Sequence, residues 1–379
     1  MIGADTIRSG FWRGKRVLIT GHTGFKGGWL CHLLLRLGAQ VAGYSLPAPT
    51  DPSLFVLTSL EERVDHHHGD VCDLAGLTRC LRTAKPDIVF HMAAQSLVLE
   101  SYRDPAGTFA TNVMGTVNLL EAVRSASSVE ACVVVTSDKC YENDESGRAH
   151  REDDPLGGID PYSASKSCAE LVTAAFRRSL FQDHAVRVAS VRAGNVVGGG
   201  DWSDDRLIPD IVRALTKRAT LELRRPDAVR PWQHVLEPLG GYLMLAERLC
   251  EDDVFEGAWN FGPAPGEIWS VRDVVSTFVD VWGEASATGI SIVPLPYAES
   301  GFLGLDSSKA RAELGWTPRW GVREAISRTV AWYGSFYRDG AEADVLIDAD
   351  LEAYATANTG PHDAATQLAG DAPFKRPVA

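Results

Sequence analysis

Five side chains capable of acid–base chemistry lie near one another in the chain. The run ACVVVTS over residues 131–137 predicts a buried strand, and it leads directly into Ser137, Asp138 and Lys139. Tyr162 and Lys166 follow within the sequence YSASK. Side chains four residues apart share one face of a helix, so we expect Lys166 beside Tyr162.

An ammonium group beside a phenol favours the phenolate. Lowering a tyrosine pKa from about 10 to near neutrality takes roughly three pKa units, or about 4 kcal/mol. Tyr162 would then remove a proton from a hydroxyl group, and the adjoining Ser-Asp-Lys turn adds groups suited to elimination. Two plainer interpretations stay open: a solvated helix face for Tyr162 and Lys166, and a strand-end turn stabilised by an Asp138–Lys139 ion pair.

The elements that must position these groups alternate along the chain. Strand patterns cover residues 15–20, 39–44, 63–70, 86–94, 131–137 and 185–192, and helical periodicity covers 74–85, 111–126 and the segment from Tyr162. This alternation predicts an α/β fold, a Rossmann-type doubly wound parallel sheet. Ligands of such sheets bind beyond the carboxyl ends of the strands. The residues expected to converge there are Gly21, Asp70, Ala93, Ser137 and Arg192.

The length of 379 residues exceeds the usual size of one domain. We expect residues 1–193 to form a dinucleotide-binding domain, with 234–262 packing back on it. Residues 194–233 and 263–338 would form a smaller mixed α/β substrate-binding lobe. From about residue 339 the chain is rich in Ala and Asp, which predicts a loosely packed or disordered tail over 339–379.

A glycine turn joins the first predicted strand to an apolar helix. Gly21, Gly24 and Gly27 have the G-x-x-G-x-x-G spacing that lets a backbone approach a pyrophosphate at a helix N-terminus. His22 and Lys26 lie within the turn, where they would add charge to that contact or point into solvent.

The second predicted strand ends in GYSLPAPT, which offers neither the acidic residue that selects NAD nor an arginine for a 2′-phosphate. Asp70, after the third strand, suits the adenine amino group or a capping role.

Composition excludes several classes of protein. The net charge of −13 disfavours a nucleic-acid surface, and no stretch approaches 18 uninterrupted apolar residues or forms a signal-peptide core. Seven cysteines without a C-x-x-C pair suit a reducing compartment, so we expect a cytoplasmic protein. The run His66-His67-His68 alternates faces on a strand, which favours a structural role, and we predict no metal site.

Longer strings carry a family resemblance over roughly residues 14–335. The glycine turn, Ala93-Ala94, Asn112 in NVMGT, and the TSDK and YSASK motifs resemble the extended short-chain dehydrogenase/reductase superfamily. Within it, GHTGFKGGWL, TSDKCYEN, VRAGNVVGGGDW and RPWQHVLEPL resemble the bacterial CDP-glucose 4,6-dehydratases.

This resemblance implies an NAD-dependent lyase that converts CDP-D-glucose to CDP-4-keto-6-deoxy-D-glucose. Hydride would leave C4, water would be eliminated across C5–C6, and hydride would return to C6. Tyr162, aided by Lys166, would be the base at the 4-hydroxyl, with Ser137 hydrogen-bonded to the same oxygen. Asp138 would be the general acid. Lys139 would be the C5 base, which requires a neutral amine, where related dehydratases have glutamate.

The resemblance also implies binding residues and partners. Asn195, Arg206 and Arg230 would hold the substrate phosphates. The residues implied to hold NAD are Gly21, His22, Thr23, Gly24, Phe25, Lys26, Gly27, Asp70, Val71, Ala93, Ala94, Gln95, Asn112, Tyr162 and Lys166. A homodimer or dimer of dimers is implied, as is a role in deoxysugar biosynthesis such as that of lipopolysaccharide O-antigen.

Two other functions remain open. A sugar-nucleotide 4-epimerase would use Tyr162, Lys166 and NAD but would not need Asp138 with Lys139. A non-catalytic dinucleotide sensor would keep the glycine turn without needing Tyr162 and Lys166.

Overall fold

The larger part of the molecule is built on one parallel sheet. The computed structural model describes residues 7–283, 289–293, 297 and 299–357, and within them seven strands form this sheet. In spatial order they are β11 (Gly257–Phe261), β6 (Arg187–Ala193), β5 (Ala131–Val135), β4 (Ile88–His91), β1 (Arg16–Thr20), β2 (Gln40–Ser45) and β3 (Asp65–His68). The predicted Rossmann-type fold is confirmed. The strand order reverses beside β1, where such sheets open a binding crevice.

Helices cover both faces of the sheet because successive strand side chains alternate between them. Val17 and Ile19 of β1 belong to one apolar cluster, and Leu18 belongs to the other. The first face is covered by α2 (Phe25–Arg36) and α11 (Leu236–Leu249). The second is covered by α5 (Leu74–Ala84), α8 (Gly115–Arg124) and α9 (Pro161–Ser179).

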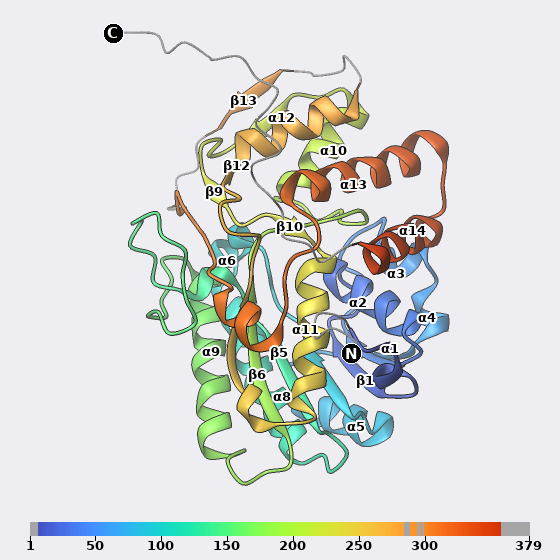
Figure 1. Ribbon diagram of the computed structural model, residues 1–379, viewed down its shortest axis with the longest axis vertical. Coiled ribbons are helices and arrows are strands. Elements are labelled where there is room, and N and C mark those ends of the chain that lie inside the picture. The colour runs from blue at the N-terminus through green and yellow to red at the C-terminus, as the bar shows by residue number, and fades with distance from the viewer. Residues whose placement is uncertain (1–6, 284–288, 294–296, 298, 358–379) are drawn as a thin grey trace.

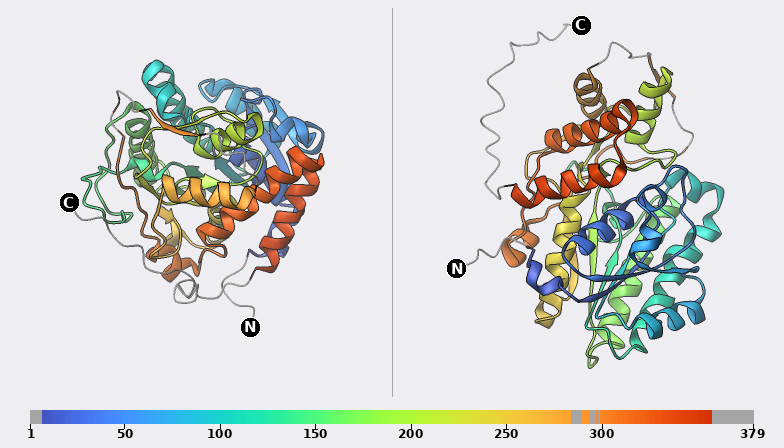
Figure 2. Two further views of the ribbon diagram at one scale, coloured as in Figure 1. Left: turned by 90° about the horizontal axis from the view of Figure 1, so that it is seen from above. Right: turned by 90° about the vertical axis from the view of Figure 1, so that its right-hand side faces the viewer.

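A smaller mixed lobe lies above the carboxyl ends of the strands (Figures 1 and 2). Its helices are α10 (Leu207–Lys217), α12 (Val271–Trp282) and α13 (Val322–Gly334). Its short strands pair as β8 (Leu221–Leu223) with β13 (Ile290–Ile292), β9 (Val229–Arg230) with β12 (Trp269–Ser270), and β7 (Val196–Val197) with β10 (Gln233–His234). Between these elements the chain returns to the sheet, where α11 packs and β11 pairs with β6.

The segment after residue 339 differs in part from the expected loose tail. Residues Ala343–Thr356 form helix α14, which packs against α2 and α3 (Leu54–Leu57). Ile347, Leu351 and Tyr354 are its buried anchors. These large side chains recur at helical spacing, so one apolar stripe stabilises the helix despite the Ala- and Asp-rich composition. Residues 358–379 lie outside the described part of the chain.

Candidate active site

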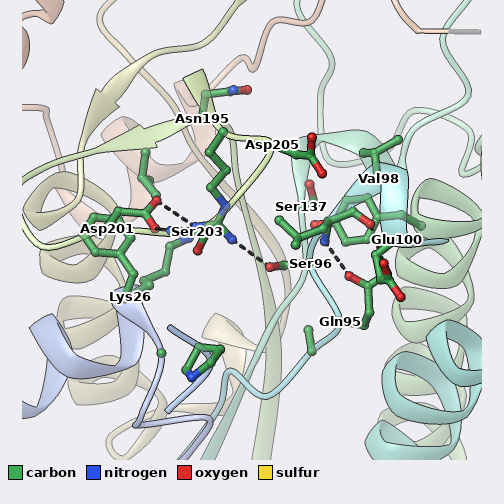
Figure 3. A pocket seen from close by; sticks show the side chains of 18 of the residues that line it. Lys26, Gln95, Ser96, Val98, Glu100, Ser137, Asn195, Asp201, Ser203 and Asp205 are labelled. Atoms are coloured by element: carbon green, nitrogen blue, oxygen red, sulfur yellow. Dashed lines mark hydrogen bonds and ion pairs between the residues drawn. The ribbon is translucent and has the colours of Figure 1, made fainter. Parts of the chain in front are cut away.

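A cavity of about 670 Å³ opens between the strand ends and the smaller lobe. The sheet side contributes the loops that follow β1 to β5, and the lobe contributes the segment after β6 together with α10, β8 and β9. Figure 3 shows labelled side chains around the cavity, among them Lys26 after β1, Ser96 after β4, Ser137 after β5 and Asn195 after β6. Most of the predicted site residues line the cavity: Gly21, Thr23, Gly24, Phe25, Lys26, Gly27, Asp70, Val71, Ala93, Ala94, Gln95, Ser137, Asp138, Lys139, Tyr162, Lys166, Asn195, Arg206 and Arg230.

The glycine turn presents bare backbone to this cavity. Gly21 has a φ of +77°, and a Cβ there would lie 2.8 Å from the Ala93 Cα. A Cβ on Gly27 would lie 2.3 Å from the Gly21 carbonyl oxygen. Gly24 lines the cavity as the N-cap of α2, and its Cβ would come no closer than 3.5 Å to its nearest neighbour. The turn therefore leaves space at a helix N-terminus that a pyrophosphate fits.

His22 lies elsewhere, which corrects the expected contact of its side chain with the cofactor. The ring is fully buried, and its Nε2 lies 2.8 Å from the Nδ1 of His66. Burial and the neighbouring histidines lower the His22 pKa to about 3, so the ring is neutral. His66 thus has the structural role expected of the histidine run.

Lys26 faces the cavity rather than solvent. Its Nζ lies 5.8 Å from the ring centroid of Tyr242, on the buried side of the site. Burial and the charges of Lys166 and Arg206 lower the Lys26 pKa to about 7. Lys26 is therefore a third amine in the cavity lining, together with Lys139 and Lys166.

Asn112 contacts the cavity wall rather than the cavity, which corrects its assignment as a direct cofactor ligand. It lies in a π-helical turn, η1 (Ala110–Met114), and is buried. Its Oδ1 accepts from the Gln95 amide at 2.9 Å, and its Nδ2 donates to the Gln95 carbonyl and to Ser165 Oγ. Asn112 therefore holds the loop after β4 against α9.

At the end of β2, the residues that line the cavity are uncharged. Ser45, the last residue of β2, and the following Leu46 and Pro47 line the cavity there. Asp70 lines the wall, and its Oδ1 accepts from the Cys72 amide at 2.9 Å. Asp70 therefore supports its own turn and also faces the cavity, so both roles considered for it are compatible with the structure.

The reactive turn directly follows β5. Residues Asp138–Cys140 form the 3₁₀ turn η2, whose N-cap is Ser137. Ser137 Oγ accepts from the Lys139 amide at 3.2 Å and donates to Asp138 Oδ1 at 3.0 Å. These local bonds are typical of Ser and Asp at strand-to-turn junctions. They hold Ser137, Asp138 and Lys139 in place relative to one another at the edge of the cavity.

Helix α9 brings Tyr162 and Lys166 to the same turn. Asp160 is its N-cap and accepts from the amide and hydroxyl of Ser163, while Pro161 occupies the first turn. Tyr162 therefore lies at the helix start, with Lys166 one turn further on. The Lys166 Nζ donates to the Val135 carbonyl at 3.2 Å. Both side chains are buried, which excludes the solvated-face interpretation.

The expectation of a Tyr162 pKa near neutrality is wrong for the chain alone. Burial raises the Tyr162 pKa to about 12, although the hydrogen bond with Ser137 and the charge of Arg206 act in the opposite direction. Burial also lowers the Lys166 pKa to about 8. Desolvation of the phenolate therefore outweighs the effect of nearby cations.

Asp138 and Lys139 both shift toward their neutral forms. Burial raises the Asp138 pKa against the effects of Lys139, Ser137 and Arg230, and Asp138 Oδ2 has no hydrogen-bond partner among the described residues. Burial and the charge of Arg230 lower the Lys139 pKa. A protonated acid and a neutral amine are the states that proton donation and proton removal require.

Two arginines enter the cavity with acidic partners. Arg206 donates to Asp201 Oδ2 at 2.9 Å and to Ser96 Oγ at 2.7 Å, joining the lobe to the sheet (Figure 3). Arg230 donates to Glu299 Oε1 at 3.2 Å and to the Ser300 carbonyl at 2.7 Å.

Sequence reasoning missed these partners. Asp201 lies five residues before Arg206 and gave a weak local signal, whereas Ser96 and Glu299 come from distant segments and gave none.

Metal and membrane signatures are absent from the described part of the chain. There, no group of three or more His, Cys, Asp or Glu side chains is placed to hold a metal ion. No described helix is long and apolar enough to cross a membrane.

The amino-acid sequence is similar to those of known proteins along most of its length. The family model described as GDP-mannose 4,6 dehydratase matches residues 18–329. A CDP-glucose 4,6-dehydratase of Salmonella typhimurium is 48% identical over 359 residues, covering 93% of this chain and 99% of the relative.

Solved structures agree with the same fold. The dTDP-glucose 4,6-dehydratase DesIV from Streptomyces venezuelae, with NAD and TYD bound, has a TM-score of 0.74 at 26% identity, covering 86% of this chain and 99% of that one. A UDP-glucose 4-epimerase of Thermus thermophilus in complex with NAD has a TM-score of 0.72 at 27% identity, covering 84% and 98%.

Proposed function

The chain belongs to the GDP-mannose 4,6 dehydratase family, and from this membership we propose that it is an NAD-dependent CDP-glucose 4,6-dehydratase. It converts CDP-D-glucose to CDP-4-keto-6-deoxy-D-glucose. The observation that carries this proposal is the turn Ser137-Asp138-Lys139 in one cavity with Tyr162 and Lys166. An epimerase needs the tyrosine and lysine but not the acid–amine pair.

Oxidation at C4 uses the α9 side of the site. The Gly21–Gly27 turn would hold NAD, which when bound would supply the hydride acceptor for C4, the hydride donor for C6 and a positive charge beside the reacting groups. Tyr162 takes the proton of the 4-hydroxyl, and Ser137 hydrogen-bonds the same oxygen. Because the Tyr162 pKa is about 12 in the chain alone, added positive charge must favour its phenolate before it acts as a base. Lys166 contributes part of that charge.

Elimination uses the turn after β5. The ketone at C4 makes the C5 proton acidic, and neutral Lys139 removes it; the resulting ammonium group gives a proton back to C5 when hydride is added at C6. Asp138 donates its proton to the C6 hydroxyl, which leaves as water. Burial supports both protonation states, since it raises the Asp138 pKa and lowers the Lys139 pKa.

The substrate diphosphate is assigned to the lobe side of the cavity. Asn195, Arg206 and Arg230 line that side, and guanidinium groups suit phosphate oxygens. Asp201 and Glu299 keep the two arginines oriented until phosphate competes for them.

A product assay across CDP-, dTDP-, UDP- and GDP-glucose tests the proposed function. We expect CDP-D-glucose to give a keto sugar nucleotide one water lighter than the substrate, without net accumulation of reduced cofactor. Mass spectrometry and NMR distinguish this product from a C4 epimer, which has the substrate's mass. Unchanged CDP-D-glucose, or an epimer, would contradict the assignment.

Assembly and cellular setting belong to the same proposal. Phe109, Met114 and Leu171 are exposed apolar side chains on α7 (Pro105–Phe109), η1 and α9, and these three elements contact one another. They support a homodimer, or a dimer of dimers, through this helical face. All seven cysteines are free, which supports a reducing compartment such as the cytoplasm. The product would enter deoxysugar biosynthesis, such as that of lipopolysaccharide O-antigen.

A further inference from the structure

A buried ion pair lies beneath the reactive turn without lining the cavity. Arg192 of β6 donates to Glu170 of α9 at 2.8 Å, and the two side chains are only 4% and 3% exposed. Arg192 was expected among the residues converging on the ligand, so its place behind the strand ends is a correction. Relative to apolar residues, a buried ion pair adds little net stability. Stability alone therefore does not explain this pair.

The pair reaches both ends of the turn. On one side, Thr136 Oγ1 donates to Glu170 Oε1, and Thr136 directly precedes Ser137. On the other side, Arg192 Nη1 donates to the hydroxyl of Tyr141, 2.7 Å away, and Tyr141 directly follows η2. The Tyr141 hydroxyl in turn donates to Asn260 Oδ1 at 2.7 Å. One charged pair thus holds the two residues that flank the turn, Thr136 and Tyr141.

The same pair joins the turn to the helix that carries the other reactive groups. Tyr162, Lys166 and Glu170 are spaced four residues apart and are all buried on one face of α9. Lys166 donates to the Val135 carbonyl, and Glu170 binds the next residue along, Thr136. Ser190 Oγ donates to Glu170 at 2.7 Å and ties β6 into the same network.

We propose that the Glu170–Arg192 ion pair is the positioning device of the active site, holding the Ser137–Lys139 turn in register with Tyr162 and Lys166. Neither residue lines the cavity, so both act through Thr136, Tyr141 and Lys166 rather than on substrate. This inference rests on the proposed dehydratase function. Misplacement of reacting groups by about 1 Å costs up to about a hundredfold in rate, which is the effect such a device prevents.

Glu170 also acts on Lys166 through charge. Burial lowers the Lys166 pKa, and the Glu170 carboxylate is the largest influence opposing it. Lys166 must be cationic to favour the Tyr162 phenolate, so activity is lost as pH rises through the Lys166 pKa. Removing the Glu170 charge lowers that pKa and moves the alkaline limb of activity to lower pH.

The decisive variant is Glu170→Gln, compared with Glu247→Gln. Glu247 is equally buried and binds Arg8 and Trp12, but it has no contact with the reactive turn. For Glu170→Gln we expect kcat to fall about tenfold to a hundredfold, KM for CDP-D-glucose to stay within about twofold, and the alkaline limb of kcat/KM to move to lower pH. Glu247→Gln should keep the wild-type kcat and pH profile, whatever its Tm.

A milder pair of variants separates geometry from charge. Tyr141→Phe removes one hydroxyl. Arg192→Lys keeps the positive charge but loses the guanidinium group whose two NH2 groups bind Tyr141 and Glu170 separately. Both should lower kcat while leaving the alkaline limb in place, because Glu170 keeps its charge. Tyr141→Phe also serves if Glu170→Gln fails to fold, and a wild-type kcat in a folded Tyr141→Phe would then overturn the proposal.

The outcomes separate this inference from the proposed function. A wild-type protein without dehydratase activity on CDP-D-glucose would contradict the function. An active wild type, with Glu170→Gln indistinguishable from Glu247→Gln in kcat and pH profile, would overturn only the positioning role.

Discussion

At the scale of single residues, burial shifts the pKa values of the two groups that we propose as acid and base. Asp138 and Lys139 are adjacent and would form an ordinary ion pair in water. In the cavity wall, burial raises the pKa of Asp138 and lowers that of Lys139. The pair is thereby shifted toward an acid that can donate and an amine that can accept a proton.

Lys139→Met tests the amine. The variant keeps the length and apolar stem of the side chain but cannot accept the C5 proton. We expect partial reaction at C4 while exchange of the C5 hydrogen with solvent deuterium is suppressed, as followed by NMR. Lys217→Met, an exposed change at the end of α10, serves as the control. C5 exchange at the wild-type rate in Lys139→Met would mean that another group is the base.

Arg230→Met tests the origin of the Lys139 shift through pH dependence. Arg230 lowers the Lys139 pKa, and the base is active when neutral, so kcat rises as pH rises through that pKa. Without the Arg230 charge the Lys139 pKa rises, and the acid limb of kcat should move to higher pH.

Arg224→Met is the matched control for this shift. Arg224 lines the same cavity and binds the Asp205 carbonyl, and its charge is not among the main influences on Lys139. An acid limb unmoved in Arg230→Met would show that Arg230 does not tune the base.

At the scale of elements, two helix N-termini define the site. The N-terminus of α2 presents the glycine turn, and that of α9 presents Tyr162 directly after its Asp160 cap. Both could be predicted from the sequence because caps, glycine spacing and helical periodicity are local signals. The loop held by Asn112 could not, since its bonds to Gln95 and Ser165 depend on how α9 packs against η1.

Gly24→Val tests the space that the glycine turn leaves for the cofactor at the start of α2. The position faces the cavity and has a φ of −83°, so a side chain is tolerated by the backbone but fills the space next to the helix N-terminus. We expect NAD affinity measured by calorimetry to fall at least about tenfold, or about 1.4 kcal/mol, with Tm nearly unchanged. Gly334→Val, where an added Cβ meets no atom within 4 Å, is the control. Wild-type affinity in Gly24→Val would place the cofactor elsewhere.

At the scale of the whole molecule, the active site exists only where the lobe meets the sheet. Arg206 of the lobe binds Ser96 of the loop after β4, so residues 110 positions apart close one wall of the cavity. Helix α14 adds a second long-range contact, packing the end of the described chain against α2. Neither helix α14 nor these contacts, which join distant segments, were predicted from the sequence.

Leu171→Glu tests the proposed assembly. Leu171 is 58% exposed on α9, and a carboxylate there would be desolvated in a helical interface. We expect analytical ultracentrifugation to show the proposed dimer for the wild type and a monomer for Leu171→Glu. Val345→Glu, which changes a side chain 60% exposed on α14, should leave assembly unchanged. A Leu171→Glu dimer of wild-type stability would exclude this helical face as the interface.

The sequence by itself determined the fold class, the glycine turn and the sharing of one helix face by Tyr162 and Lys166. These features follow from the spacing of neighbouring residues, which local backbone geometry converts directly into structure. Only the packed chain shows that His22 lies against His66, and that Glu170 and Arg192 form a buried ion pair in contact with the residues on either side of the reactive turn. The tertiary structure also decided the burial of Tyr162, which raises its pKa to about 12. Those outcomes depend on burial and on partners from distant segments, and both arise only when the chain is packed.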